Sequence, residues 1–182
     1  MILGLVGSEM CIRDRTNTYL GQPFVDSGEQ IDDFMLAERR EPMPNVPDDV
    51  VLLTAGVDVQ DNRLEISIIG FGRDDESYVI NHMTLYGDPS TPQLWTNLDS
   101  ILNKQFETES GRQIAIRGSC VDSGGHFTNS VYAYCTKNQG RRIFAIKGVG
   151  GEGKPMVGRP SKNNIAKCPL FPIGVDLSLI HI

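Results

Sequence analysis

The feature that most constrains the fold is a series of three strand-like segments, separated only by short turns. Residues 50–59 are almost wholly apolar and predict a strand covered on both faces. Residues 63–72 alternate apolar and polar side chains, as a half-exposed strand does. The intervening QDN turn predicts a hairpin. Residues 77–86, rich in β-branched and aromatic side chains, predict a third strand, so the chain should contain an antiparallel meander.

After this meander, helical and strand-like segments alternate. Residues 91–106 carry apolar side chains at helical spacing, with Pro92 suited to the first turn and Trp95 expected in the core. A second helix, with Val131, Tyr134 and Cys135 facing inward, is predicted to end at Lys137. Further strands are predicted at 113–121, 142–147 and 170–175, with a glycine-rich basic loop over 148–167. This element order predicts an α/β protein with a mixed sheet flanked by helices.

Three aspartates occupy related positions in these strands. Asp58 lies within the first strand, Asp122 ends the strand over 113–121, and Asp176 follows the last strand; each comes directly after a valine. An unpaired carboxylate inside a buried strand is strongly disfavoured, and a bound metal ion would compensate for it. If the strand ends lie side by side, the three carboxylates meet at one edge of the sheet.

Such a cluster suits the hydrolysis of a phosphodiester. Two divalent ions roughly 3.5–4 Å apart activate the attacking water and stabilise the leaving oxygen. Mg²⁺ or Mn²⁺ takes hard oxygen ligands, so two or three carboxylates suffice for the pair of ions. We therefore predict that Asp58, Asp122 and Asp176 are catalytic metal ligands. The alternative is that each aspartate only caps a strand or starts a turn.

Residues near these acids are candidates for phosphate contacts. Gly124 and Gly125, directly after Asp122, permit a close approach of a ligand to the backbone. His126 and Lys147 are predicted to contact a phosphate or the attacking water, although exposed His and Lys side chains are often only solvated.

The loop over 148–167 contains a motif that resembles an ATP-binding loop but lacks its chemistry. GVGGEGK fits the spacing G-x-x-x-x-G-K, yet Pro155 stands where Ser or Thr would coordinate magnesium, and no helix is predicted after it. Residues 103–167 hold 11 Lys/Arg against 4 Asp/Glu, whereas residues 1–102 hold 6 against 18. We predict that Lys154, Arg159 and Lys162 of this basic loop contact DNA.

Composition bounds the remaining possibilities. The 182 residues, 40% of them apolar, suffice for one well-packed domain. The four cysteines form no zinc-binding pattern, so reduced thiols are expected, and no signal peptide or membrane-spanning segment is predicted. Residues 6–15 (VGSEMCIRDR) and 177–182 (LSLIHI) look like translated adapter sequence. We therefore expect non-native tails at 1–15 and 177–182, a linker over 16–49 with a short helix over 31–39, and a folded domain over 50–176.

Several segments together resemble the nuclease domain of the large terminase subunit of lambda-like tailed phages, the GpA family. The matching segments are ERREP (38–42), LTAGVDVQDNRL (53–64), YGDP (86–89), VDSGGH (121–126), RRIFAIKG (141–148) and IGVD (173–176). The resemblance implies a ribonuclease H-like fold and a metal-dependent endonuclease that cuts concatemeric phage DNA during packaging in the host cytoplasm. It places Asp58 and Asp122 on the metal-binding acids, and Asp176 on the third. It also implies that an ATPase motor domain precedes the linker, and that a small terminase subunit and a portal are partners.

Two other classes of function are compatible with the same pattern. An actin-like or sugar-kinase ATPase also begins with a β-hairpin and a strand-borne aspartate, but glycine and threonine should follow that acid, whereas this chain has Val59-Gln60-Asp61. A non-catalytic DNA-binding or assembly module would use the same acids only to shape turns, and it would bind DNA with strong salt dependence.

Overall fold

In the computed structural model the chain divides into two compact units, residues 1–42 and 43–182. The structure describes residues 38, 46–73, 76–151, 153–162 and 167–175, so the following account concerns the second unit. Both predicted tails, most of the predicted linker with its helix, and Asp176 lie outside the described residues.

The predicted meander is present. Strands β1 (Leu52–Val59), β2 (Arg63–Phe71) and β3 (Ser77–Tyr86) pair antiparallel in this order. The backbone N–H of Gln60 donates to the carbonyl of Arg63 at 3.0 Å, which closes the first hairpin. The hairpin pairing sets Asp58 directly opposite Glu65.

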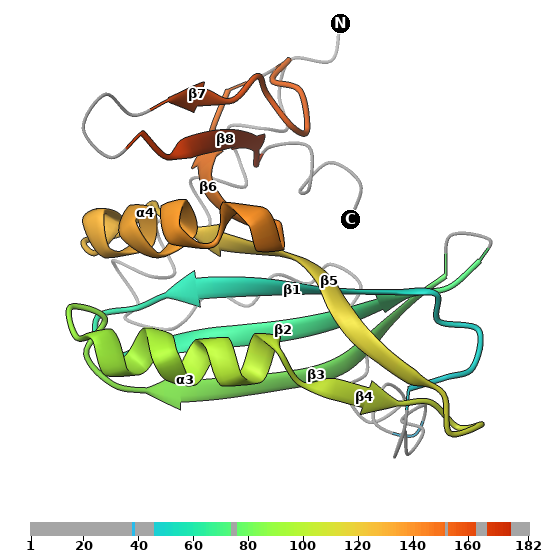
Figure 1. Cartoon of the computed structure of the whole chain (residues 1–182). Coiled ribbons are helices and arrows are strands. Elements are labelled where there is room, and N and C mark those ends of the chain that lie inside the picture. Colours follow the sequence, from blue (N-terminus) through green and yellow to red (C-terminus); the bar gives the residue numbers. More distant parts are fainter. Residues whose placement is uncertain (1–37, 39–45, 74–75, 152, 163–166, 176–182) are drawn as a thin grey trace, which may run out of the picture. The chain divides into compact units, whose positions relative to one another are not determined.

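Parallel strands continue the sheet on the other side of β1 (Figure 1). Strands β5 (Gln113–Asp122), β6 (Ile143–Val149) and β8 (Pro169–Gly174) run parallel to β1, and the full order is β3-β2-β1-β5-β6-β8-β7. Two short strands, β4 (Gln105–Glu107) and β7 (Ser161–Lys162), were not predicted. The mixed α/β sheet expected from the sequence is therefore confirmed.

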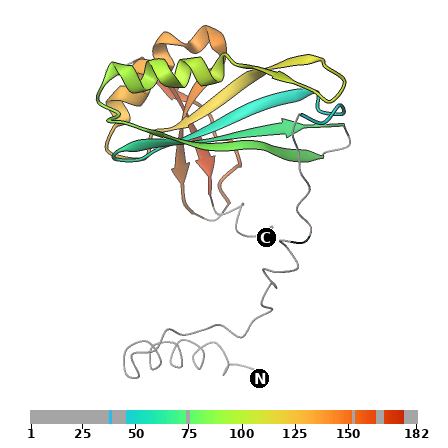
Figure 2. The same ribbon diagram turned by 90° about the horizontal axis from the view of Figure 1, so that it is seen from below.

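Helices α3 (Pro92–Leu102) and α4 (Thr128–Lys137) lie on the same side of the sheet (Figure 2). The first begins after Thr91, with Pro92 in its first turn as predicted, and buries Leu94, Trp95, Leu98 and Leu102. The second buries the three predicted residues together with Tyr132, and a 3-10 turn, η2 (Gln139–Arg141), follows it. Trp95 and Tyr134 join the two helices with ring centroids 4.8 Å apart.

Only one face of the sheet belongs to this core, which corrects the prediction for β1. Leu53, Ala55 and Val57 are buried on the helix side, whereas the alternate positions Gly56 and Asp58 are exposed. Leu52 and Gly56 lie exposed on the open face of β1. Their presence makes the sequence of the strand look continuously apolar, although only one of its faces is packed. The premise that Asp58 is buried is therefore wrong.

Two further boundaries differ from the prediction. The helix predicted over 91–106 ends at Leu102, and Phe106 instead enters the core from β4, which pairs with β5. At the start of the domain, Val46 is only 2% exposed and its N–H donates to the carbonyl of Glu107 at 3.1 Å. Packing therefore begins a few residues before the predicted boundary at residue 50.

The cysteines agree with the expectation of reduced thiols. Cys120, Cys135 and Cys168 are free, whereas Cys11 lies outside the described residues. Burial, together with the nearby thiols, raises the pKa of Cys135 to about 12, so this thiol remains protonated and inert. Among the described residues, no helix is long and apolar enough to span a membrane.

Candidate active site

The open face of the sheet carries a cleft of about 550 Å³ that is lined by Asp58 and Asp122, the two predicted site aspartates within the described residues. Its walls come from β1, β2, β3, β5, β6 and β8, and we name it the acidic cleft after Asp58, Glu65 and Asp122. Helices α3 and α4 lie on the opposite face, so the core supports the cleft from behind while its mouth stays open.

Strand pairing explains why two acids that are 64 residues apart in sequence meet here. In the parallel pairing of β1 with β5, Val57 lies opposite Val121, so Asp58 and Asp122 follow in the next row. Both valines are nearly inaccessible on the core side, at 3% and 0% exposure. Because successive side chains on a strand point to opposite faces, the two aspartates share the open face.

Each aspartate keeps one carboxylate oxygen that accepts no hydrogen bond from the described residues. Gln60 donates its side-chain N–H to Oδ2 of Asp58, and the backbone N–H of Gly124 donates to Oδ1 of Asp122 at 3.0 Å. A Cβ at position 124 would lie 3.3 Å from Oδ1 of Asp122, so glycine permits this close approach. The remaining oxygens suit a hard cation.

Glu65 is a third acid of the cleft that sequence analysis missed. Both of its oxygens are engaged: Arg63 Nε donates to Oε1 at 2.6 Å and the Thr84 hydroxyl donates to Oε2 at 2.7 Å. His82 Nε2 lies 3.6 Å from Oε2. The Thr84 hydrogen bond, followed by the Arg63 interaction, lowers the pKa of Glu65 below its usual value. The predicted alternation of β2 and its hairpin pairing with β1 contained the signal that would have placed it opposite Asp58.

Because its folded-state pKa is lowered, Glu65 should stabilise the protein above about pH 4.5, and this stabilisation should disappear as pH falls through the folded-state value. We expect Glu65→Gln to reduce the loss of unfolding free energy between pH 7 and pH 3.5. Urea denaturation at both pH values measures this loss, and Glu109→Gln, at an exposed carboxylate elsewhere, is the control. An unchanged pH dependence in Glu65→Gln would contradict this assignment.

The other predicted residues are distributed more widely. His126 Nδ1 lies 3.2 Å from Oδ1 of Asp61, in the β1–β2 turn, and both side chains are largely exposed. Gly125 approaches the backbone of Val59. Lys147 occupies the same side of β6 as the buried Ile143 and Ala145, and it does not line the acidic cleft. Their contacts with phosphate remain predictions.

The three predicted basic residues are described by the structure, whereas the third predicted acid is not. Lys154, Arg159 and Lys162 are exposed, and Lys162 belongs to β7. Asp176 lies outside the described residues, although Val175 before it lines the cleft. Within the described part of the chain, no group of three or more His, Cys, Asp or Glu side chains is placed to hold a metal ion.

An open-faced mixed sheet with carboxylates at the ends of adjacent parallel strands suits a class of metal-assisted hydrolases, and comparison with known proteins identifies the family. A sequence profile described as "Terminase large subunit gpA, endonuclease domain" matches residues 5–178. The chain therefore belongs to the endonuclease-domain family of the terminase large subunit gpA, as the resemblance predicted.

Two curated relatives support this assignment. The terminase large subunit of Escherichia phage lambda is 35% identical over 162 residues, which cover 88% of this chain and 25% of the relative. The terminase large subunit of Enterobacteria phage P21 is 30% identical over 162 residues, with the same coverage of both chains. The chain thus spans about a quarter of the length of these relatives. No solved structure matches the chain.

Proposed function

We propose that this domain is a metal-dependent DNA endonuclease of a phage terminase that cuts concatemeric viral DNA during genome packaging. The observation that carries the proposal is the position of Asp58 and Asp122 in the same row of the adjacent parallel strands β1 and β5, on the open face of the sheet. Family membership supports the same activity. An accessible face accommodates a DNA backbone, whereas an enclosed pocket would not.

The fold that we propose is ribonuclease H-like. The antiparallel β1–β3 meander, with the parallel strands β5 and β6 added beside β1, agrees with the element order expected for that fold. In this arrangement Asp58 lies on a central strand and Asp122 ends its parallel neighbour. We further propose that Asp176 supplies a third carboxylate beside them.

The donor set fits Mg²⁺ or Mn²⁺, because Asp58 and Asp122 each offer a carboxylate oxygen without a hydrogen-bond partner among the described residues. When bound, two such ions activate water and stabilise the charge that develops on the phosphate. Gln60 and the N–H of Gly124 orient the two carboxylates. Glu65 differs because Arg63 and Thr84 occupy both of its oxygens, so we assign it a positioning role.

In the complete terminase, this domain would act together with partners. We propose that the partners are double-stranded phage DNA, a small terminase subunit and a portal, and that the protein acts in the cytoplasm of the infected host. Basic residues of the 148–167 loop, including Lys154, Arg159 and Lys162, are proposed to contact the DNA backbone.

Plasmid nicking tests the proposed activity. We expect the purified chain to convert supercoiled DNA to the open-circular form with Mg²⁺ or Mn²⁺, and EDTA to abolish the conversion, because the carboxylates alone cannot activate water. Agarose gel electrophoresis measures the rate. Salt-sensitive DNA binding without nicking would favour the non-catalytic module, and a thermal shift with ATP would favour the ATPase class.

A further inference from the structure

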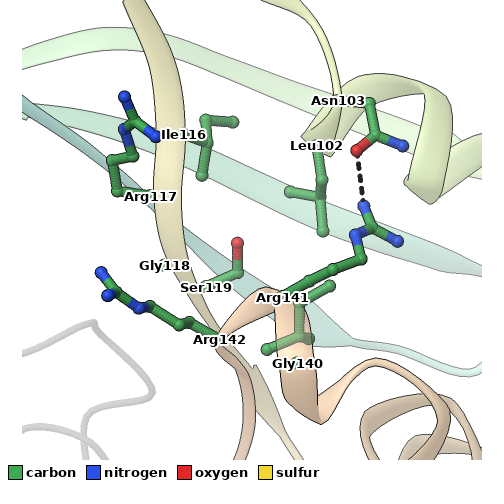
Figure 3. A pocket seen from close by; sticks show the side chains of 10 residues that line it. Leu102, Asn103, Ile116, Arg117, Gly118, Ser119, Gly140, Arg141 and Arg142 are labelled. Carbon is green, nitrogen blue, oxygen red and sulfur yellow. Dashed lines mark hydrogen bonds between the residues drawn. The ribbon is translucent and has the colours of Figure 1, made fainter.

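A second pocket of about 320 Å³ lies beside residues 116–119 in the middle of β5 and shares no lining residue with the acidic cleft (Figure 3). We name it the arginine pocket, because Arg117, Arg141 and Arg142 line it and none of its ten lining residues is acidic. Arg117 precedes Asp122 by five residues on β5, roughly 16 Å along an extended strand. The pocket is therefore distinct from the acidic cleft.

The three guanidinium groups are held differently. Arg141 is anchored by the carboxylate of Asp99 at 2.7 Å and by the side-chain oxygen of Asn103 at 2.8 Å. Among the described residues, Arg117 and Arg142 have no side-chain hydrogen bond or ion pair, and Figure 3 shows them extending to the same side of β5. Two cationic forks are thus available at the rim of the pocket.

The floor of the pocket adds a neutral hydrogen-bond donor. Ser119 is only 4% exposed, and its hydroxyl points into the space between the arginine-bearing segments in Figure 3. The hydroxyl is open to the space of the pocket, because among the described residues no fully buried side-chain nitrogen or oxygen lacks a hydrogen-bond partner. It is therefore available to donate a hydrogen bond to a ligand in the pocket.

The backbone conformation at Arg142 is a further feature of the pocket. Arg142 has a φ of 57°, in the left-handed region that glycine adopts far more readily. The conformation ends η2, and the Arg142 carbonyl accepts the Ser119 N–H at 3.0 Å. This bond fixes the start of β6 beside the Ser119 hydroxyl, so the Arg142 side chain is held at the rim.

We propose that the arginine pocket binds a phosphate group, supplied by free phosphate, a nucleotide or the DNA backbone. Guanidinium forks bind phosphate oxygens with paired charge-assisted hydrogen bonds, and the Ser119 hydroxyl provides a further donor. The two free forks and this hydroxyl offer more donors than the two oxygens of a carboxylate can accept. The site requires no divalent ion, so it is separable from the proposed nuclease activity.

Isothermal titration with the full 182-residue chain in EDTA tests this proposal. The probes are inorganic phosphate, a deoxynucleoside monophosphate, a short DNA duplex and acetate. We expect at least one phosphate-bearing probe to bind, and Arg117→Gln or Arg142→Gly to weaken its affinity about tenfold or more. Glycine at position 142 preserves the left-handed backbone. Ser119→Ala should weaken the same probe by a smaller factor.

Arg73→Gln, at an exposed arginine near the β2–β3 turn, removes the same charge and should leave the affinity unchanged. If the pocket variants lose affinity for inorganic phosphate or the nucleotide, the ligand is a free phosphate compound. If they lose affinity only for the duplex, the ligand is the DNA backbone. The proposal would be overturned if Arg73→Gln lost as much affinity as the pocket variants. It would also be overturned if acetate bound more strongly than every phosphate-bearing probe, or if no probe bound. The titration is performed in EDTA and does not measure cleavage, so failure here is distinguishable from failure of the nuclease assignment.

Discussion

Asp58→Asn is expected to reduce metal-dependent plasmid nicking by about 100-fold or more. Coordination of a catalytic metal contributes several kcal/mol to stabilisation of the transition state, and about 1.4 kcal/mol corresponds to a factor of ten in rate. Asparagine preserves the shape of the side chain and its acceptor for Gln60, but it removes the charge that holds the cation. The loss should therefore appear in catalysis while the fold remains intact.

Asp61→Asn is the matched control, since Asp61 follows three residues later and is exposed in the hairpin turn. Asparagine keeps an oxygen acceptor for His126 but removes the charge, and we expect less than a threefold change in nicking, about what a weak surface ion pair contributes. Asp122→Asn should resemble Asp58→Asn. Full nicking by Asp58→Asn, with an unchanged melting temperature in both variants, would remove Asp58 from the site.

Asp176→Asn distinguishes the third carboxylate from Glu65. If Asp176 is a ligand, its substitution should reduce nicking as strongly as that of Asp58. Glu65→Gln should have the smaller effect, because both oxygens of Glu65 are engaged by protein donors. The reverse order would assign the third position to Glu65 and correct our proposal.

The elements of the sheet were predictable where local pattern and tertiary environment agree. The β1–β2 hairpin has a two-residue turn between apolar segments, and each predicted strand within the described region was confirmed. Trp95 and the inward face of α4 followed from helical periodicity and were also confirmed. Periodicity succeeds here because both helices cover a single face of the sheet.

The errors arose where partners distant in sequence decide the outcome. Phe106 continues the apolar spacing of α3, but pairing with Ile114 places it in β4. The apolar composition of β1 suggested two covered faces, and composition alone cannot show that only one face is packed. The predicted hairpin would have placed Glu65 opposite Asp58, but its contact with Thr84 depends on the register between β2 and β3, which local sequence does not fix.

The structure also changes the reason for assigning Asp58 to a metal site. The sequence suggested a buried charge that required compensation, whereas the structure places Asp58 on an exposed face above a buried Val57. Solvent already stabilises an exposed carboxylate, so burial gives no reason to expect a metal. The case for a metal site now depends on the proximity of Asp122 and on family membership.

Trp95→Ala is expected to lower the free energy of unfolding by about 3–5 kcal/mol, which is typical for removing a large buried aromatic side chain. Trp95 is 8% exposed, packs against Tyr134, and donates its indole N–H to the carbonyl of Pro89 at 2.9 Å. Urea denaturation followed by circular dichroism measures the change, because the substitution removes the chain's only tryptophan and its fluorescence.

Tyr86→Ala is the control for the loss of an aromatic side chain, since Tyr86 is 74% exposed and should change stability by less than about 0.5 kcal/mol. Trp95→Phe should fall between these variants, because it retains ring packing but leaves the Pro89 carbonyl without its donor. Equal destabilisation by Trp95→Ala and Tyr86→Ala would contradict the packing argument. Because Trp95 lies on the helix side of the sheet and the acidic cleft opens on the other face, nicking by Trp95→Ala should decline only in proportion to the unfolded fraction.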